Sequence, residues 1–223
     1  MGFFDLQMRI EDCRCCVFVK SFEGEGLPEH GLSSHWSWWF RNKWPIEGGF
    51  YYTFFKWDSF SNVVFITLRP STEWVPDTAD FFFANALKVN GLVREVFRFE
   101  GDTFIFYEGV LVTDLVKCKG KAKEVVEKVP EKCLAFIREE LDMVRKYSGR
   151  EPRIIAVGKK SRELLYEHRI DIGIKAYKSV DDIPWIYLHN YAEWQGKRMK
   201  RIEAFKKYVN QIREAISKAK PIN

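Results

Sequence analysis

The chain has 223 residues, of which 46% are hydrophobic and 16% aromatic, and this composition excludes a disordered protein. We expect one compact domain over residues 1–223, with an aromatic-rich insertion at about residues 17–62. The net charge is +5, and a charged fraction of 30% is typical of thermophile proteins. The sequence has neither a signal peptide nor an apolar run of membrane-spanning length, so we expect a cytoplasmic protein that does not bind a membrane.

Short apolar runs alternate with helical patterns along most of the chain. The runs are typical of strands buried on both faces and lie at residues 63–68, 110–116, 154–157 and 185–188. The helical patterns lie at residues 81–92, 130–147, 161–168 and 198–219. This alternation predicts an α/β fold, a three-layer α/β/α sandwich around a central four-stranded parallel sheet. Residues 93–109 are expected to form an inserted hairpin.

The last predicted helix has an apolar stripe and a basic outer face. Its lysines are expected to point outward. The residues expected to face inward are Met199, Ile202, Phe205, Val209, Ile212 and Ile216.

Cations are clustered in two parts of the sequence. One cluster consists of Lys117, Lys119, Lys121 and Lys123, and the other of Lys197, Arg198, Lys200 and Arg201. Such clusters suit a polyanion better than a neutral metabolite. The alternative is a solvated charged face.

The carboxyl ends of parallel strands are where open sheets bind their ligands. The second predicted strand carries Thr113 and Asp114 to this edge, and the turn Gly158-Lys159 follows the third. The fourth strand leads to His189. A lone histidine is more often structural, but a position at a strand end raises the odds of a functional role. The sequence therefore predicts that a binding site lies at this edge.

Five cysteines suggest a metal centre. Cys13 and Cys16 form a Cys-x2-Cys pair, and Cys133 falls in the first turn of a predicted helix. With Cys118, four thiolates could converge, and their number and softness suit an iron–sulfur cluster or a structural zinc. The alternatives are unlinked buried thiols, or disulfides if the source is a hyperthermophile.

Together these segments resemble the uracil-DNA glycosylase superfamily, most closely its iron–sulfur branch, family 4. The resemblance covers most of the chain. It is carried by the order and spacing of the cysteines, including those in VTDLVKC and EKCLAFIREEL, by PRIIAVGKKSRELL, and by WIYLHNY followed by a basic helix. It implies a 4Fe–4S cluster held by Cys13, Cys16, Cys118 and Cys133, with zinc as the alternative metal.

The resemblance also implies an enzyme of DNA base excision repair. Such an enzyme flips a damaged nucleotide out of the stack and hydrolyses its N-glycosidic bond. His189 would stabilise negative charge on the departing base. The base itself would be contacted by Phe81, Asp114 and Asn190. DNA, single-stranded or a duplex with a lesion, would be the partner of a monomer.

Contacts with the rest of the DNA follow from the same resemblance. Tyr191 or Trp194 would wedge into the gap that the flipped nucleotide leaves. Lys197, Arg198 and Arg201 would hold phosphates.

The sequence departs from the family at the residue that activates water. Leu68 stands where family 4 has a glutamate, so we expect a loop carboxylate to serve instead, and among Glu73, Asp77 and Asp80 we favour Asp77. The alternative is a non-catalytic iron–sulfur protein that binds nucleic acid.

The base specificity is also expected to differ. Relatives commonly have asparagine where this chain has Asp114, and an ionised aspartate can only accept hydrogen bonds. The Asp114 carboxylate therefore suits a guanine-type edge with two donors better than it suits uracil. The alternative is that Asp114 caps a loop or pairs with Lys117. We therefore expect an enzyme that is not restricted to uracil.

Overall fold

The computed structural model of the protein describes residues 5–6, 9–10, 13, 44–46, 49–51, 53–55, 61–69, 78–92, 94–98, 105–108, 110–117, 126–187 and 198–223. None of the helices in this part of the chain is long and apolar enough to cross a membrane.

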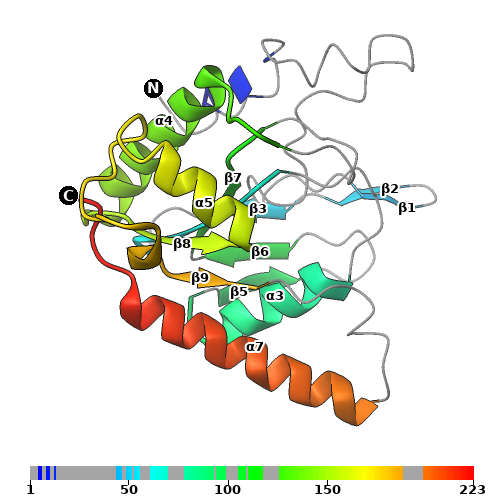
Figure 1. The fold of residues 1–223 in the computed structure, drawn as a ribbon. Helices are drawn as coiled ribbons and strands as arrows, with labels where there is room; N and C mark the ends of the chain where they lie inside the picture. The colour runs from blue at the N-terminus through cyan, green and yellow to red at the C-terminus, as the bar shows by residue number, and fades with distance from the viewer. Residues whose placement is uncertain are drawn as a thin grey trace.

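The centre of the fold is a four-stranded, all-parallel sheet (Figure 1). Its strands are β4 (Val63–Thr67), β7 (Leu111–Asp114), β8 (Arg153–Val157) and β9 (Trp185–Ile186), in the spatial order β7-β4-β8-β9. The chain passes from β4 to the edge strand β7, and from β8 to the opposite edge strand β9, which places a topological switch point between β4 and β8. The prediction of an α/β fold with a four-stranded parallel sheet is thereby confirmed.

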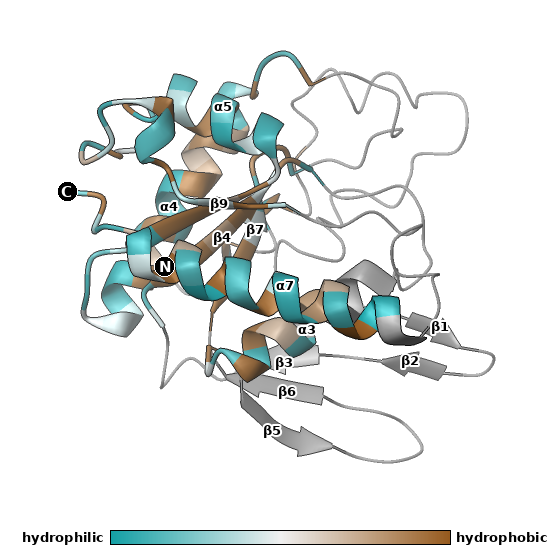
Figure 2. Ribbon diagram, turned by 60° about the horizontal axis from the view of Figure 1, so that its bottom comes forward, coloured by the Kyte–Doolittle hydropathy of each residue, from teal (hydrophilic) through white to brown (hydrophobic). Residues whose placement is uncertain are grey.

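Helices cover both faces of this sheet. The four described α-helices of more than a turn are α3 (Thr78–Val89), α4 (Glu131–Ser148), α5 (Lys159–Glu167) and α7 (Arg198–Lys218). Val64 and Ile66 of β4 share a core with α4 and α5, whereas Val63 and Phe65 share one with α3 and α7. This follows from the alternation of side chains along a strand. Figure 2 shows the hydrophobic strands between helices with hydrophilic outer faces, an arrangement compatible with three layers.

Helix α7 runs antiparallel to the strands and overhangs the sheet. Its far end leads to Pro221, which pairs with Arg153 at the start of β8, so α7 begins on the carboxyl side of the sheet. Its 21 residues span about 30 Å, against about 17 Å for a five-residue strand. The inward prediction for Ile202 is therefore wrong: it is 39% exposed on the overhanging turns.

The rest of the predicted stripe of α7 is partly confirmed. Val209 and Ile212 are buried, and Phe205 and Ile216 pack half-buried against the same core. Tyr208 is also fully buried, which the sequence did not predict. The side chain of Met199 lies outside the described residues.

The described strands also form a second, three-stranded sheet, which is not hydrogen-bonded to the first. Strands β5 (Arg94–Arg98) and β6 (Ile105–Glu108) pair antiparallel, which confirms the predicted hairpin. Strand β3 (Thr53–Phe55), from the predicted insertion, pairs parallel to β6. A short hairpin of β1 (Trp44–Ile46) and β2 (Gly49–Tyr51) precedes it.

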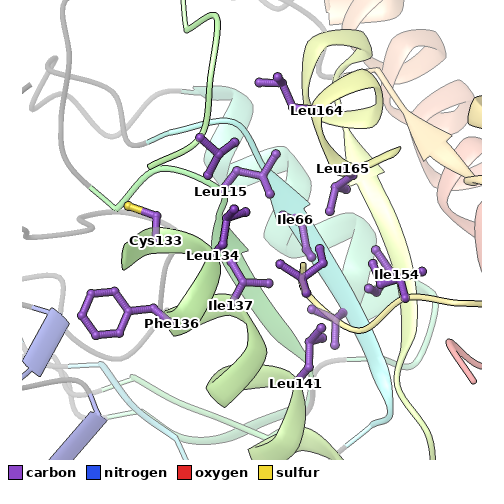
Figure 3. Close-up of a cluster of buried hydrophobic side chains, with 14 of the residues drawn as sticks. Ile66, Leu115, Cys133, Leu134, Phe136, Ile137, Leu141, Ile154, Leu164 and Leu165 are labelled. Atoms are coloured by element: carbon purple, nitrogen blue, oxygen red, sulfur yellow. The ribbon is translucent and has the colours of Figure 1, made fainter. Parts of the chain in front are cut away.

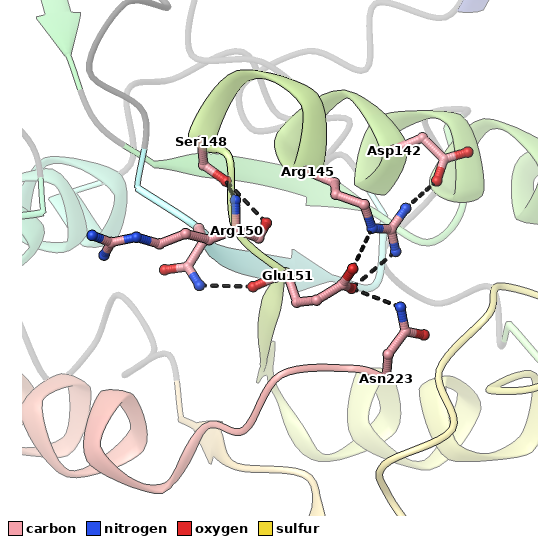
Figure 4. Close-up of polar contacts among 7 residues, drawn as sticks. Asp142, Arg145, Ser148, Arg150, Glu151 and Asn223 are labelled. Atoms are coloured by element: carbon pink, nitrogen blue, oxygen red, sulfur yellow. Dashed lines mark hydrogen bonds and ion pairs between the residues drawn. The ribbon is translucent and has the colours of Figure 1, made fainter.

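The C-terminal end of α4 is tied to the start of β8 and to the end of the chain (Figure 4). Arg145 donates to both carboxylate oxygens of Glu151, over 2.8 and 3.1 Å, and also to Asp142. Asn223 donates to Glu151 over 2.9 Å. Gly149 ends the helix with φ 66°, a left-handed conformation that favours glycine.

Candidate functional site at the carboxyl edge of the sheet

The carboxyl ends of β4 and β7 present a buried polar pair. Thr67 and Asp114 are register partners, and the Thr67 hydroxyl donates a hydrogen bond to Asp114 Oδ1. Asp114 is completely buried and Thr67 is 5% exposed. A carboxylate at the end of a buried strand is costly unless its oxygens are hydrogen-bonded. Thr67, which the sequence did not single out, meets part of this need.

The turn after β8 completes the edge beside the switch point. Gly158 has φ 93° and ψ 150°, a region essentially restricted to glycine, and its N–H donates to Ile186 O over 2.9 Å. In the first turn of α5, the Ser161 hydroxyl donates to Ile66 O over 2.7 Å. These bonds hold the ends of β4, β8 and β9 together, with Lys159 exposed at the rim.

A buried ion pair lies behind the end of β7. Lys117 Nζ is 2.7 Å from each carboxylate oxygen of Glu140 and 2.6 Å from the Thr113 hydroxyl oxygen. The two charged side chains are 1% and 0% exposed. Counting Lys117 among the cations available to a polyanion is therefore wrong, because its ammonium group is neutralised inside the protein. Its described hydrogen bonds go to Thr113 and Glu140.

Two of the four predicted metal ligands are described, and they lie against one core. Cys133 is buried in the first turn of α4, and Cys13 packs half-buried against the hydrophobic cluster that contains it. Figure 3 shows Cys133 at the start of α4, next to Leu134 and Leu115. Two cysteines from opposite halves of the chain thus contribute to the same core. No group of three or more candidate ligands occurs among the described residues, which include only these two cysteines.

The other predicted site residues are described in part or not at all. Arg201 is exposed on the overhanging turns of α7. Phe81 and Arg198 lie in α3 and α7, where their backbone alone is described. The residues outside the described part of the chain are Cys16, Asp77, Cys118, His189, Asn190, Tyr191 and Lys197.

A cavity of about 370 Å³ runs alongside β9. Trp185, Tyr187 and Gln211 contribute to its lining, and the Tyr187 N–H donates to Gln211 Oε1 over 3.3 Å. The guanidinium of Arg162 lies 5.8 Å from the centre of the Trp185 ring. Among the predicted site residues that the structure describes with their side chains, such as Asp114, Cys133 and Arg201, none lines this cavity.

Sequence reasoning missed the buried ion pair between α4 and the residues after β7. Glu140 lies on the inward stripe of α4 with Ile137, Leu141 and Val144. A glutamate among apolar positions of a helix is a signal for a buried charge that needs a cationic partner. The sequence contained that signal, but it did not identify Lys117 as the partner.

No protein-family model matches the chain, and no curated protein matches its sequence significantly.

Proposed function

We propose that this chain is a DNA glycosylase with the three-layer architecture of the uracil-DNA glycosylase superfamily. The observation that carries the proposal is that Cys133 belongs to the core cluster against which Cys13 also packs. The family-4 resemblance requires those two cysteines to lie near each other, and packing against the same core agrees with that requirement although they are far apart in the sequence. The parallel sheet, with Asp114 at its carboxyl edge, supports the same assignment.

The proposed reaction uses the edge of the sheet. The enzyme takes a damaged nucleotide out of the stack, because the glycosidic bond and the base edges are inaccessible inside a duplex. Phe81 stacks on the base, and Asp114 and Asn190 read its edge. His189 donates a hydrogen bond to the base as negative charge develops on it, and Asp77 takes a proton from the attacking water.

The proposed metal centre joins three segments of the chain. Cys13 and Cys16, Cys118 and Cys133 would hold a 4Fe–4S cluster, with zinc as the alternative. When bound, it would cross-link the N-terminal segment, the loop after β7 and helix α4. Its contribution is structural in this proposal, so no step of the hydrolysis depends on it.

The proposed DNA contacts lie on α7. Because its first turns overhang the carboxyl edge, the exposed Arg201 lies on the side where a flipped nucleotide would enter. With Lys197 and Arg198, it would neutralise phosphates, and Tyr191 would fill the gap in the stack.

The second candidate function is a non-catalytic iron–sulfur protein that binds nucleic acid. One specific observation favours it: Leu68, half-buried against the core, occupies the position where family 4 has a water-activating glutamate. An apolar side chain there cannot activate water. Such a protein would retain the phosphate contacts of α7 and lose base excision.

A panel of oligonucleotides, each with one lesion, tests the two candidates. The protein is incubated with single-stranded and duplex forms, and abasic sites are revealed by alkaline cleavage. We expect cleavage at one class of lesion and its loss by about 10²-fold or more in His189→Ala with unchanged DNA affinity, since the hydrogen bond acts in the transition state. Binding without cleavage at any lesion would favour the non-catalytic candidate, and equal loss of binding and cleavage would make His189 structural.

Metal analysis tests the cluster independently. Anaerobically purified protein is expected to be brown and to contain iron and sulfide in equal amounts. Colourless protein that contains zinc would replace the iron assignment by the zinc one.

A further inference from the structure

We propose that Glu139 and Glu140, adjacent residues of α4, are positioning residues that clamp two cysteine-bearing segments onto the helix that carries Cys133. Arg9 pairs with Glu139 and Lys117 pairs with Glu140. The inference rests on the proposed function, because it concerns how the thiols of the proposed cluster are brought together.

The outer clamp holds the N-terminal segment. Arg9 donates to both carboxylate oxygens of Glu139, over 2.6 and 2.8 Å, in the bidentate geometry that fixes orientation as well as distance. Its guanidinium also lies 5.9 Å from the centre of the Phe136 ring. Figure 3 shows Phe136 on the side of α4 turned away from Ile66, where this segment docks.

The same segment delivers Cys13 by a tight turn. Leu6 and Ile10 are buried in the cluster that contains Cys133. The Cys13 N–H donates to Ile10 O over 3.2 Å, so the position of Cys13 follows from that of Ile10. Burial of Leu6 and Ile10 thus fixes how closely the segment packs on the core, and the bidentate contact of Arg9 fixes its orientation relative to α4.

The inner clamp holds the chain just before Cys118. Lys117 reaches both oxygens of Glu140 at 2.7 Å, and the Thr113 hydroxyl at 2.6 Å completes a closed network. Cys118 is the next residue in the sequence. Fixing the ammonium group of Lys117 inside the protein therefore fixes the chain at the residue before Cys118.

Helix α4 is the common frame for both clamps. Successive helical residues point about 100° apart, so Glu139 and Glu140 face different neighbours: one the N-terminal segment, the other β7. Glu140 lies two turns after Cys133 and on the same side of the helix. A buried ion pair contributes little net stability compared with apolar residues of similar volume, and it is better suited to specifying one arrangement.

The chain contains a matched control for the outer clamp. In the last turn of α4, Arg145 makes the same bidentate contact with Glu151. The side chains of that pair are 35% and 33% exposed, against 37% and 32% for Arg9 and Glu139. The two ion pairs are therefore similar in geometry and exposure, and the control pair, in which Arg145 also contacts Asp142, lies farther along α4 from Cys133.

The experiment compares the full chain, purified anaerobically, with three variants: Arg9→Met, the double variant Lys117→Met/Glu140→Gln, and the control Arg145→Met. The double variant removes both buried charges and leaves an amide as partner for Thr113. Iron and sulfide per chain and the rate of iron loss to a chelator are measured. Urea unfolding of the metal-free forms reports whether each variant folds.

We expect both clamp variants to fold, to retain less iron than the wild type, and to lose it about 10-fold faster or more, as is typical when residues that orient metal ligands are removed. Arg145→Met should match the wild type. Clamp variants that keep wild-type iron content and loss rate would overturn the inference, as would an equal effect of Arg145→Met. A wild type without iron or sulfide would instead refute the proposed cluster, so the two failures are distinguishable.

Discussion

The side chains of Thr67 and Asp114 are hydrogen-bonded to each other across the ends of neighbouring parallel strands, and Asp114 is completely buried there. The hydroxyl of Thr67 can serve only as a donor to an ionised carboxylate, so the pair fixes the orientation of Asp114. A carboxylate oriented at a strand end, in surroundings of low dielectric constant, discriminates strongly between donors and acceptors on a ligand.

The first prediction is that Asp114→Asn raises excision of uracil relative to that of guanine-type lesions. Asparagine can keep the hydrogen bond from Thr67 through its carbonyl oxygen, while its amide adds a donor for the O4 of uracil. Opposing acceptors would cost the wild type about 1–3 kcal/mol on uracil, which is about 5-fold to 150-fold in relative rate. Single-turnover kinetics of both proteins on matched duplexes measure the ratio. Efficient uracil release by the wild type, unchanged by the substitution, would contradict the role of Asp114.

The second prediction concerns the salt dependence of DNA binding. The double variant Lys197→Gln/Arg201→Gln should weaken binding to all sequences and reduce the slope of log affinity against log salt by about 0.9 for each phosphate that is no longer neutralised. Lys218→Gln is the control, because Lys218 lies at the other end of α7 and is paired with Glu214 at 2.5 Å. Fluorescence anisotropy at several salt concentrations measures the slopes. Equal slopes for the variant and the wild type would exclude the phosphate contacts.

The central sheet could be predicted because each of its strands is marked by a pattern within its own short stretch of sequence. Residues 63–67 are all buried, since helices cover both faces of β4, and an unbroken apolar run is the sequence pattern of such a strand. The predicted hairpin was likewise local. The parallel pairing of β3 with β6 was not, because it joins segments that are far apart in the sequence, and no short pattern encodes such a partner.

Only the part of the candidate site that lies at the strand ends could be predicted from the sequence. The position of Asp114 at the carboxyl edge follows from the end of an apolar run. In the sequence Lys117 is the first of four lysines at alternate positions, and nothing local sets it apart from the others. Its burial depends on Glu140 in a later helix. The exposure of Ile202 depends on the length of α7 relative to that of the sheet, which periodicity alone does not contain.

The third prediction is a pH dependence of stability at the C-terminal end of α4. Hydrogen bonds from Arg145, opposed in part by burial, hold the pKa of Glu151 below its ordinary value of 4.5. Because the pKa is lower in the folded state, the stabilisation is fully present above pH 4.5 and is lost as the pH falls through the folded-state value. The pair is about one-third exposed, so solvent screening limits its contribution to about 1 kcal/mol or less.

Urea unfolding of the wild type and of Glu151→Gln at pH 7 and at pH 3 tests this pH dependence. The difference in unfolding free energy should be present at pH 7 and should shrink at pH 3. The control is Glu163→Gln, on the exposed face of α5, which should change stability little at either pH. A gap for Glu151→Gln that widens in acid would reverse the sign and exclude this linkage.

The last prediction separates the stability of the buried ion pair from its role in positioning. Lys117→Met alone removes the ammonium group from Glu140, which is 0% exposed and has the Thr113 hydroxyl near its oxygens. Losing one partner of a buried pair typically costs about 3–5 kcal/mol, whereas removing both charges is often neutral. The unfolding free energy of the metal-free protein should therefore fall markedly in Lys117→Met and recover most of that loss in Lys117→Met/Glu140→Gln. Urea unfolding of the two variants and of Glu140→Gln closes the double-mutant cycle. If the single and double variants are equally destabilised, the pair supplies net stability, and the fold depends on the charges themselves.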